Sequence, residues 1–254
     1  MCGRYRLTKR RLLEIEEYYG VEDIRDLDLW EREFNIPPGE MAPIIFDHKG
    51  SRHLVQALWG LRSSWTESPE QANRVSTFNA KAETLIAKPA FKDAFLRRRC
   101  IVPAEAFYEW VGPKSGRQPL SIGRVDGRLL SLAGLFNYWK ARDSAGPSIA
   151  TFTVVTTTPN QWMARIHNRM PALLPDNQIN AWLDPTIADS AKLAELLKAP
   201  PENFLECYPV SKEMSSARVD HPACVEKIEL DYLSLLNPPP SPEQEPTPVQ
   251  QELF

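Results

Sequence analysis

The chain lacks the residue patterns on which metal centres and membrane spans depend. Its four cysteines and four histidines, spread over 254 residues, form neither a CxxC nor an HxxxH pair. Structural zinc sites take their ligands from closer spacings than these, so we expect neither a metal nor another cofactor. No apolar run is long enough to cross a bilayer, and the Arg-containing start does not resemble a secretory signal. The sequence therefore predicts a cytoplasmic protein without membrane contact.

The sequence also has only a small excess of negative over positive residues, with a formal net charge of −3. Three glutamates in the last eighteen residues, a stretch without Lys or Arg, account for all of it. The rest of the chain is neutral, so net charge neither supports nor excludes a local basic groove for nucleic acid. From Asn237 onward the composition is rich in Pro, Glu and Gln. We therefore expect one domain over residues 2–236 and a disordered Pro-rich tail over residues 237–254.

Short apolar and β-branched runs alternate with turn residues along the domain, and no internal repeat is present. A hairpin is expected through Asp126-Gly127, a strong turn dipeptide that separates two of these runs. The pattern predicts an α+β fold with a mixed, mostly antiparallel sheet and short peripheral helices. The expected strands cover 41–46, 54–61, 100–103, 106–111, 120–125, 129–136, 150–157, 172–174 and 204–210. The expected helices cover 9–19, 88–99, 159–166, 177–183 and 190–198.

Cys2 is the residue with the most distinctive chemistry. Removal of Met1 would leave an α-amine and a thiol on one residue, which only a chain terminus can present. The amine has an ordinary pKa of about 7.7–8.0 and the thiol about 8.5, so both are usable nucleophiles near neutral pH. Such a group can attack an amide, or it can capture an aldehyde as an imine that the thiol closes to a thiazolidine. The alternative is that Cys2 is a small buried apolar residue, as free cysteines often are.

Three further positions each allow a structural and a functional interpretation. Glu109 lies in an apolar strand between Tyr108 and Trp110, where it either points outward at an edge or faces a pocket that would raise its pKa. His167 lies in a loop after an expected helix, as an ordinary histidine or as a site residue. Trp59 and Trp65 bracket Arg62, either as core residues or as a stacking platform for unpaired bases.

Four motifs together resemble the SOS response-associated peptidase (SRAP) family, which forms abasic-site DNA–protein crosslinks. They are Met1-Cys2-Gly3-Arg4-Tyr5, Phe78-Asn79-Ala80-Lys81-Ala82-Glu83-Thr84, Phe107-Tyr108-Glu109-Trp110 and His167-Asn168-Arg169-Met170-Pro171. The resemblance extends from residue 2 to about residue 212. It implies a single domain with a barrel-like core, present as a monomer. It also implies a DNA-damage protein that acts at the nucleoid.

The resemblance implies that the protein binds single-stranded DNA and shields abasic sites through a covalent thiazolidine at Cys2. Asn79 would position the α-amine, Glu109 would act as acid and base near the imine, and His167 would move protons during ring opening and reversal. The implied DNA-binding residues are Arg4, Lys81, Trp65 and Arg62. The family usually has Arg where this chain has Lys81, which keeps the charge but loses the bidentate fork on a phosphate. The stretch 212–221 also departs from the family pattern.

Two other functions remain open from the sequence. The same four groups could serve a cysteine N-terminal-nucleophile peptidase that processes a protein or its own N-terminus, or the protein could bind damaged single-stranded DNA without a covalent bond. The tail adds a partner hypothesis, because it ends with Gln250, Leu253 and Phe254 at the positions of a bacterial sliding-clamp-binding peptide. A Pro-rich tether would raise the effective concentration of such a peptide at a replication fork.

Overall fold

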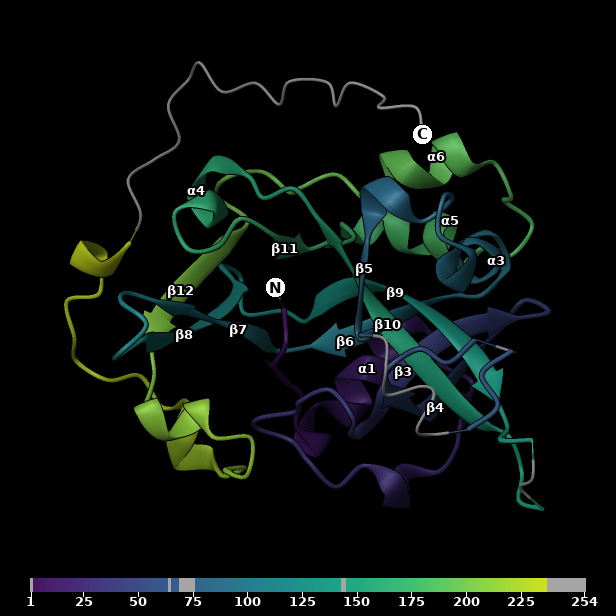
Figure 1. Ribbon diagram of the computed structural model, residues 1–254, viewed down its shortest axis with the longest axis horizontal. Helices are drawn as coiled ribbons and strands as arrows, with labels where there is room; N and C mark the ends of the chain where they lie inside the picture. The colour runs from purple at the N-terminus through teal and green to yellow at the C-terminus, as the bar shows by residue number, and fades with distance from the viewer. Residues whose placement is uncertain (1, 64, 69–75, 143–144, 237–254) are drawn as a thin grey trace.

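The computed structural model describes residues 2–63, 65–68, 76–142 and 145–236, and it contains two β-sheets with short helices around them (Figure 1). The tail, with Gln250, Leu253 and Phe254, lies outside the described residues. In Figure 1 the four-stranded sheet lies on the left and the larger sheet on the right. The first described residues of the chain run between them.

The four-stranded sheet contains strands from both ends of the domain. Its order is β1 (Tyr5–Arg6), β7 (Ala106–Val111), β8 (Gln118–Arg124) and β12 (Leu205–Pro209), and every neighbouring pair is antiparallel. The N-terminal strand β1 therefore forms an edge of this sheet and depends on a partner about 100 residues away in the chain.

The larger sheet closes into a five-stranded barrel. The ring consists of β4 (Ser51–Trp59), β3 (Met41–His48), β6 (Arg99–Ala104), β9 (Leu130–Trp139) and β10 (Ile149–Thr157). A parallel pairing of β10 with β4, Thr151 opposite Leu58, closes it. The short strands β2 (Asp23–Ile24), β5 (Asn79–Lys81) and β11 (Met170–Pro171) extend its edges. This arrangement confirms the predicted α+β fold with a mixed, barrel-like core.

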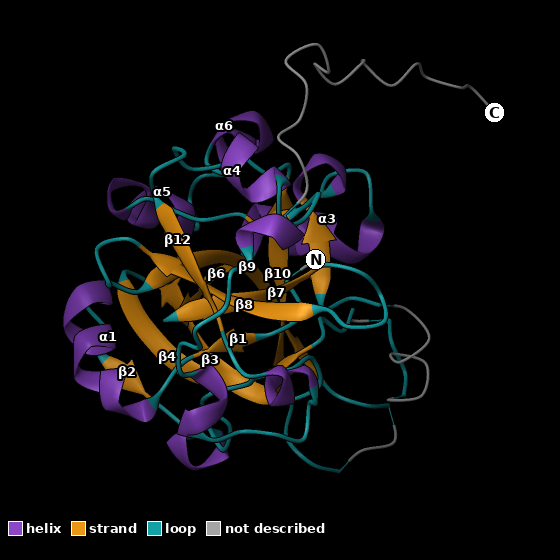
Figure 2. Cartoon of the chain, turned by 90° about the vertical axis from the view of Figure 1, so that its left-hand side faces the viewer, coloured by secondary structure: helices purple, strands orange, loops and turns teal. Residues whose placement is uncertain are grey.

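The helices are short and lie around the two sheets (Figure 2). They are α1 (Leu12–Tyr19), α3 (Pro89–Arg97), α4 (Gln161–Ala164), α5 (Ile179–Leu183) and α6 (Ser190–Glu195). α1 buries Ile15 and Tyr19 and ends at Gly20, whose left-handed φ of 62° is the usual C-cap conformation. Within the described ranges, no helix has the length and apolar character needed to cross a membrane.

The strand expected over 172–174 is instead β11 at Met170–Pro171, and two predictions that rested on turn or cap residues were also wrong. The turn at Asp126-Gly127 forms, with the Gly127 N–H donating to the Arg124 carbonyl at 3.0 Å, but its flanking strands do not pair as a hairpin. β8 pairs with β7 and β12, whereas β9 joins the barrel, so the turn carries the chain from one sheet to the other. Pro159 also lies before α4 rather than in its first turn, since the N-cap is Asn160. The residues of a turn determine its local conformation, whereas tertiary packing determines which strands pair.

Trp59 belongs to the core, which excludes a joint stacking platform with Trp65. Its side chain is 1% exposed, stacks on Phe152 with ring centroids 5.9 Å apart, and donates its indole N–H to the Phe78 carbonyl at 2.8 Å. Trp65 in contrast is 57% exposed.

Candidate active site around Cys2

Cys2 is fully buried and is held by the strand that follows it. Tyr5 lies opposite Phe107, and the Tyr108 N–H donates to the Arg4 carbonyl at 3.0 Å. Continuing this antiparallel register places Gly3 opposite Glu109, one residue from the thiol. Pairing to β7 thus brings the start of the chain to the acidic residue of the Phe-Tyr-Glu-Trp motif.

Asn79 connects Cys2 to the barrel. It is the first residue of β5, which runs parallel to β10 with Asn79 opposite Val154. The Asn79 side-chain amide donates from Nδ2 to the Cys2 carbonyl at 2.8 Å. Within the described part of the chain, its buried Oδ1 has no hydrogen-bond partner. The Asn79 side chain therefore fixes the backbone of Cys2, and its Oδ1 remains as a hydrogen-bond acceptor near Cys2.

Glu109 is buried, with 4% of its surface exposed. Burial raises the pKa of its carboxyl group, because the low-dielectric surroundings disfavour the charged form. Burial also raises the pKa of the Cys2 thiol well above its usual range, and the charge of Glu109 adds to that shift. The two groups are thus electrostatically coupled, and the site favours a neutral thiol over a thiolate.

His167 follows α4, whose first turn is capped by the Asn160 side chain accepting the Met163 N–H at 2.9 Å. The His167 Nδ1 accepts the backbone N–H of Arg169 at 3.0 Å, so the proton of the neutral imidazole is on Nε2. Burial lowers the pKa of His167, which keeps the ring neutral to lower pH.

An ion pair that the sequence analysis missed joins two of the four motifs. Arg169 binds both carboxylate oxygens of Glu83, at 2.8 and 2.9 Å, and donates to the Thr156 carbonyl of β10 at 2.6 Å. Burial opposes ionisation of Glu83, but the Arg169 guanidinium lowers the pKa of this carboxyl. The pair holds the His167 loop against the turn that follows Asn79.

Arg117 is a second missed residue. It lies on the loop between β7 and β8 with its side chain exposed. Its positive charge lowers the pKa of Glu109 against the larger effect of burial, and it lowers the pKa of His167 in the same direction as burial. One cation that acts on both groups indicates that they lie near one another. Cys2, Asn79, Glu109 and His167 are therefore brought together, linked in turn by the Asn79 hydrogen bond, the Cys2–Glu109 coupling and the shared Arg117.

Of the four expected DNA-binding residues, Arg4 is engaged inside the protein. Its guanidinium donates to the Asn35 Oδ1 at 2.7 Å and to the carbonyls of Met214 and Ser215 at 3.3 and 3.4 Å. It also lies 5.9 Å from the centroid of the Trp110 ring. These contacts connect β1 to the segment 211–225 and give Arg4 a structural role whether or not it also contacts phosphate.

The other three expected DNA-binding residues lie at the barrel surface. Lys81 is exposed at the end of β5. Arg62 is half-buried, with its guanidinium 4.2 Å from the centroid of the Trp139 ring. Trp65 is exposed beside α3 and borders a small cavity with Arg98 and Asn137. Among the described residues, no group of His, Cys, Asp and Glu has the arrangement of a metal site.

Comparison with known proteins shows the family of this chain. The family model described as "SOS response associated peptidase (SRAP)" matches residues 1–217. The chain belongs to this family. It is similar to the abasic site processing protein YoqW of Bacillus subtilis, 31% identical over 89% of this chain and 99% of that protein. It is also similar to the abasic site processing protein HMCES of Gallus gallus, 30% identical over 91% of this chain and 79% of that protein.

Solved structures show the same fold. A protein from Bacteroides thetaiotaomicron superimposes with a TM-score of 0.75 over 90% of this chain and 98% of that chain, at 24% identity. A protein from Bordetella bronchiseptica gives a TM-score of 0.70 over 83% of this chain and all of that chain, at 25% identity.

Proposed function

We propose that this protein processes abasic sites in single-stranded DNA by forming a thiazolidine between Cys2 and the ring-opened sugar aldehyde. The proposal is supported most directly by the burial of Cys2 at position two, with its carbonyl held by Asn79 and its thiol coupled to Glu109. Relatives similar over most of the chain are named abasic site processing proteins. The reaction requires removal of Met1, which frees the α-amine of Cys2.

The proposed reaction has three bond-forming or bond-breaking steps. The neutral amine of Cys2 adds to the aldehyde carbon to give a carbinolamine. The carbinolamine loses its hydroxyl as water and becomes an imine. The thiol sulfur then adds to the carbon of the protonated imine; the nitrogen keeps its proton, and the thiol proton passes to the Glu109 carboxylate. The product is the two reactants minus one water, with no oxidant or reductant.

Each side chain has a task that fits its environment. Glu109, whose burial favours the protonated form, donates to the departing hydroxyl, and its carboxylate then accepts the thiol proton. His167 presents a proton on Nε2 that can be donated to the sugar ring oxygen during opening. Asn79 holds the Cys2 backbone, and its buried Oδ1 is an acceptor for an amine proton. Lys81, Arg62 and Trp65 would hold the DNA.

The protonation state of the Cys2 thiol favours attack by the amine followed by ring closure over cleavage of a peptide bond. A cysteine peptidase attacks with a thiolate, whereas burial raises the pKa of the Cys2 thiol. An amine that attacks first, followed by a neutral thiol that closes the ring, needs no thiolate at the start. Processing of a peptide at the N-terminus by the same groups is the second candidate activity.

The deciding experiment uses protein whose free Cys2 amine is confirmed by intact mass. It is mixed with an oligonucleotide bearing one abasic site and separated on a denaturing gel. We expect a slow band with the native protein and none with Cys2→Ala or with undamaged DNA. Borohydride should trap an imine with Cys2→Ala, because that variant keeps the amine but cannot close the ring. Absence of the band with the native protein would refute crosslinking and favour the peptidase.

The sliding clamp is a separate proposed partner through Gln250, Leu253 and Phe254. A peptide that spans residues 249–254 should bind the bacterial clamp, and a peptide with Leu253 and Phe254 replaced by Ala should not. Failure of the native peptide to bind at high micromolar concentration would remove this partner without affecting the chemistry at Cys2.

A further inference from the structure

A cavity of about 670 Å³ lies on the barrel, between the end of α3 and the β3–β4 hairpin, and neither the chemistry nor the four motifs account for it. Aromatic rings line much of it. They are Phe46, His48, His53, Phe136 and Tyr138. A volume of this size is within the range of sites that bind small organic groups.

The rings form a connected set. Phe46 contacts Phe136 with centroids 4.6 Å apart and stacks on His53 at 5.6 Å with an interplanar angle of 17°. Phe136 meets Tyr138 edge to face at 5.9 Å. Tyr138 itself is 49% exposed, so one end of the set offers a ring to a ligand from solution.

Four cationic side chains border the same cavity, whereas Asp47 is the one carboxylate among its lining residues. They are Arg25, Lys49, Arg97 and Arg98. Lys49 lies at the tip of the β3–β4 hairpin with a left-handed φ of 59°. Arg97 and Arg98 share a single carboxylate, Asp93. Arg25 is paired with Asp23 at 2.6 Å, so the cavity combines aromatic faces with a small excess of positive charge.

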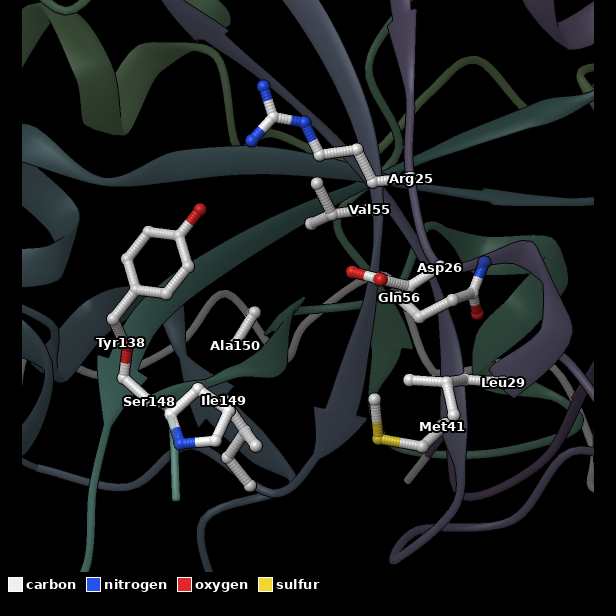
Figure 3. Close-up of a pocket in the computed structure, with 11 residues that line it drawn as sticks. Arg25, Asp26, Leu29, Met41, Val55, Gln56, Tyr138, Ser148, Ile149 and Ala150 are labelled. Carbon is white, nitrogen blue, oxygen red and sulfur yellow. The ribbon is translucent and has the colours of Figure 1, made fainter. Parts of the chain in front are cut away.

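Two smaller cavities share lining residues with this one. Arg25, Val55 and Tyr138 also line an adjoining cavity of about 270 Å³, shown in Figure 3, where the Arg25 and Tyr138 side chains stand on opposite walls. On the other side, Arg98 borders both the large cavity and the small one beneath the exposed Trp65. Trp65, Arg98 and Tyr138 thus mark a path along three neighbouring cavities that share lining residues.

We propose that this path is a binding groove for the undamaged strand that flanks the abasic nucleotide, with bases stacked on Tyr138 and phosphates near Lys49 and Arg97. Alternating aromatic and cationic side chains are how proteins hold single-stranded nucleic acid without reading its sequence. This inference rests on the proposed function for its ligand, and it adds a second contact region beyond Trp65. It predicts that affinity depends on strand length.

The test measures equilibrium binding of undamaged, fluorescently labelled strands to Cys2→Ala protein, so that crosslinking cannot contribute. Strands of about 20 nucleotides should bind with a tighter Kd than strands of about 6. Tyr138→Ala should weaken binding of the long strand about fivefold or more, the low end of one stacked base, and leave the short strand unchanged. Tyr138→Phe, which keeps the ring, should retain the native affinity.

Charge is tested by the salt dependence of the same binding. Lys49→Gln should reduce the slope of log K against log salt by about 0.7 for each phosphate that the lysine neutralises in the native complex. Lys192→Gln, a matched change on exposed α6, should not alter the slope. Photo-crosslinking with 5-iododeoxyuridine at successive positions should label the peptide that contains Tyr138 from defined distances along the strand.

The results separate this groove from the proposed function. A short abasic oligonucleotide should crosslink to Tyr138→Ala protein as it does to the native protein. Normal crosslinking together with equal long-strand affinity in Tyr138→Ala would overturn the groove alone. Competition by millimolar deoxynucleoside monophosphate, with no dependence of strand affinity on Tyr138, would assign the cavity to free nucleotides instead. If strand affinity depends on Tyr138 but no crosslink forms, the binding groove is supported and the crosslinking reaction at Cys2 is refuted.

Discussion

Arg169 and Glu83 form a bidentate ion pair that holds the loop carrying His167 against the turn that follows Asn79. The two residues are 86 positions apart in the chain, yet each lies within four residues of a proposed catalytic group. The pair is half exposed at Glu83, so its main effect is on geometry rather than on the free energy of unfolding.

Glu83→Gln should therefore separate catalysis from stability. The rate of crosslinking should fall about 10- to 100-fold, because His167 would no longer be held in place. The free energy of unfolding should fall by less than about 1 kcal/mol. Single-turnover gels and urea titrations measure the two quantities. Glu195→Gln, which breaks the exposed Glu195–Lys198 pair, is the control and should change neither by much. Equal loss of both would contradict a positioning role.

Asn79→Ala removes the hydrogen bond to the Cys2 carbonyl. A hydrogen bond of this kind contributes about 0.5–1.5 kcal/mol, so crosslinking should slow by about 2- to 12-fold while the DNA affinity stays unchanged. Asn180→Ala, a change on the surface of α5, is the comparison. An unaltered rate with a confirmed free amine would mean that Asn79 does not orient the nucleophile.

Glu109→Gln should stabilise the protein at neutral and alkaline pH. The folded-state pKa of Glu109 is raised by burial, so between its ordinary pKa of about 4.3 and the raised value the folded state holds a proton that the unfolded state has lost. Stability therefore falls as pH rises through this window. Glu109→Gln removes this pH dependence of stability. Each 1 kcal/mol gained in the free energy of unfolding should raise the melting temperature by about 2–4 °C. Thermal scans from pH 4 to pH 9 would show it.

The same substitution should lower the crosslinking rate by about 10²- to 10⁴-fold, the usual contribution of a general acid or base. The native rate should decline as the pH rises through the raised pKa of Glu109, and this decline should be absent in Glu109→Gln. A native profile without this decline would argue against Glu109 as the proton donor.

Arg4→Ala decides between the structural and the phosphate-binding role of this residue. Loss of the hydrogen bonds to Asn35, Met214 and Ser215 should cost about 2 kcal/mol and lower the melting temperature by about 4–8 °C. The salt dependence of DNA binding should remain native. Arg10→Ala, on a largely exposed side chain, should have little thermal effect. If Arg4→Ala instead reduces the slope of log K against log salt by about 0.7, Arg4 contacts a phosphate.

Much of the fold could be predicted because apolar runs such as 150–157 are both strand-forming and buried. The sequence could not predict that β8 and β9 separate into different sheets, since the Asp126-Gly127 turn looks the same in either case. Arg99, expected at the end of a helix, is buried in β6, and its guanidinium donates to the Phe95 carbonyl at 3.0 Å and the Leu96 carbonyl at 2.8 Å. Its contact with α3 was predictable, but its burial was not.

The candidate site was predicted residue by residue because its members lie in four compact motifs. Those motifs gave no information on contacts between them. The Arg169–Glu83 pair, the position of Arg117 and the contacts of Arg4 with residues 214–215 all depend on segments far apart in the chain. Only tertiary structure brings such segments together.

The pairing of β1 with β7 sets an order of events during synthesis. Once Tyr5 has docked against Phe107, Cys2 is fully buried. The proposed reaction requires removal of Met1, and we expect an aminopeptidase to act most readily before this docking. Because β7 is translated about 100 residues after β1, at about 5–20 residues per second, the aminopeptidase has roughly 5–20 s in which β1 has no partner strand. For the proposed nucleophile, the distance along the chain between two strands therefore sets the time available for maturation.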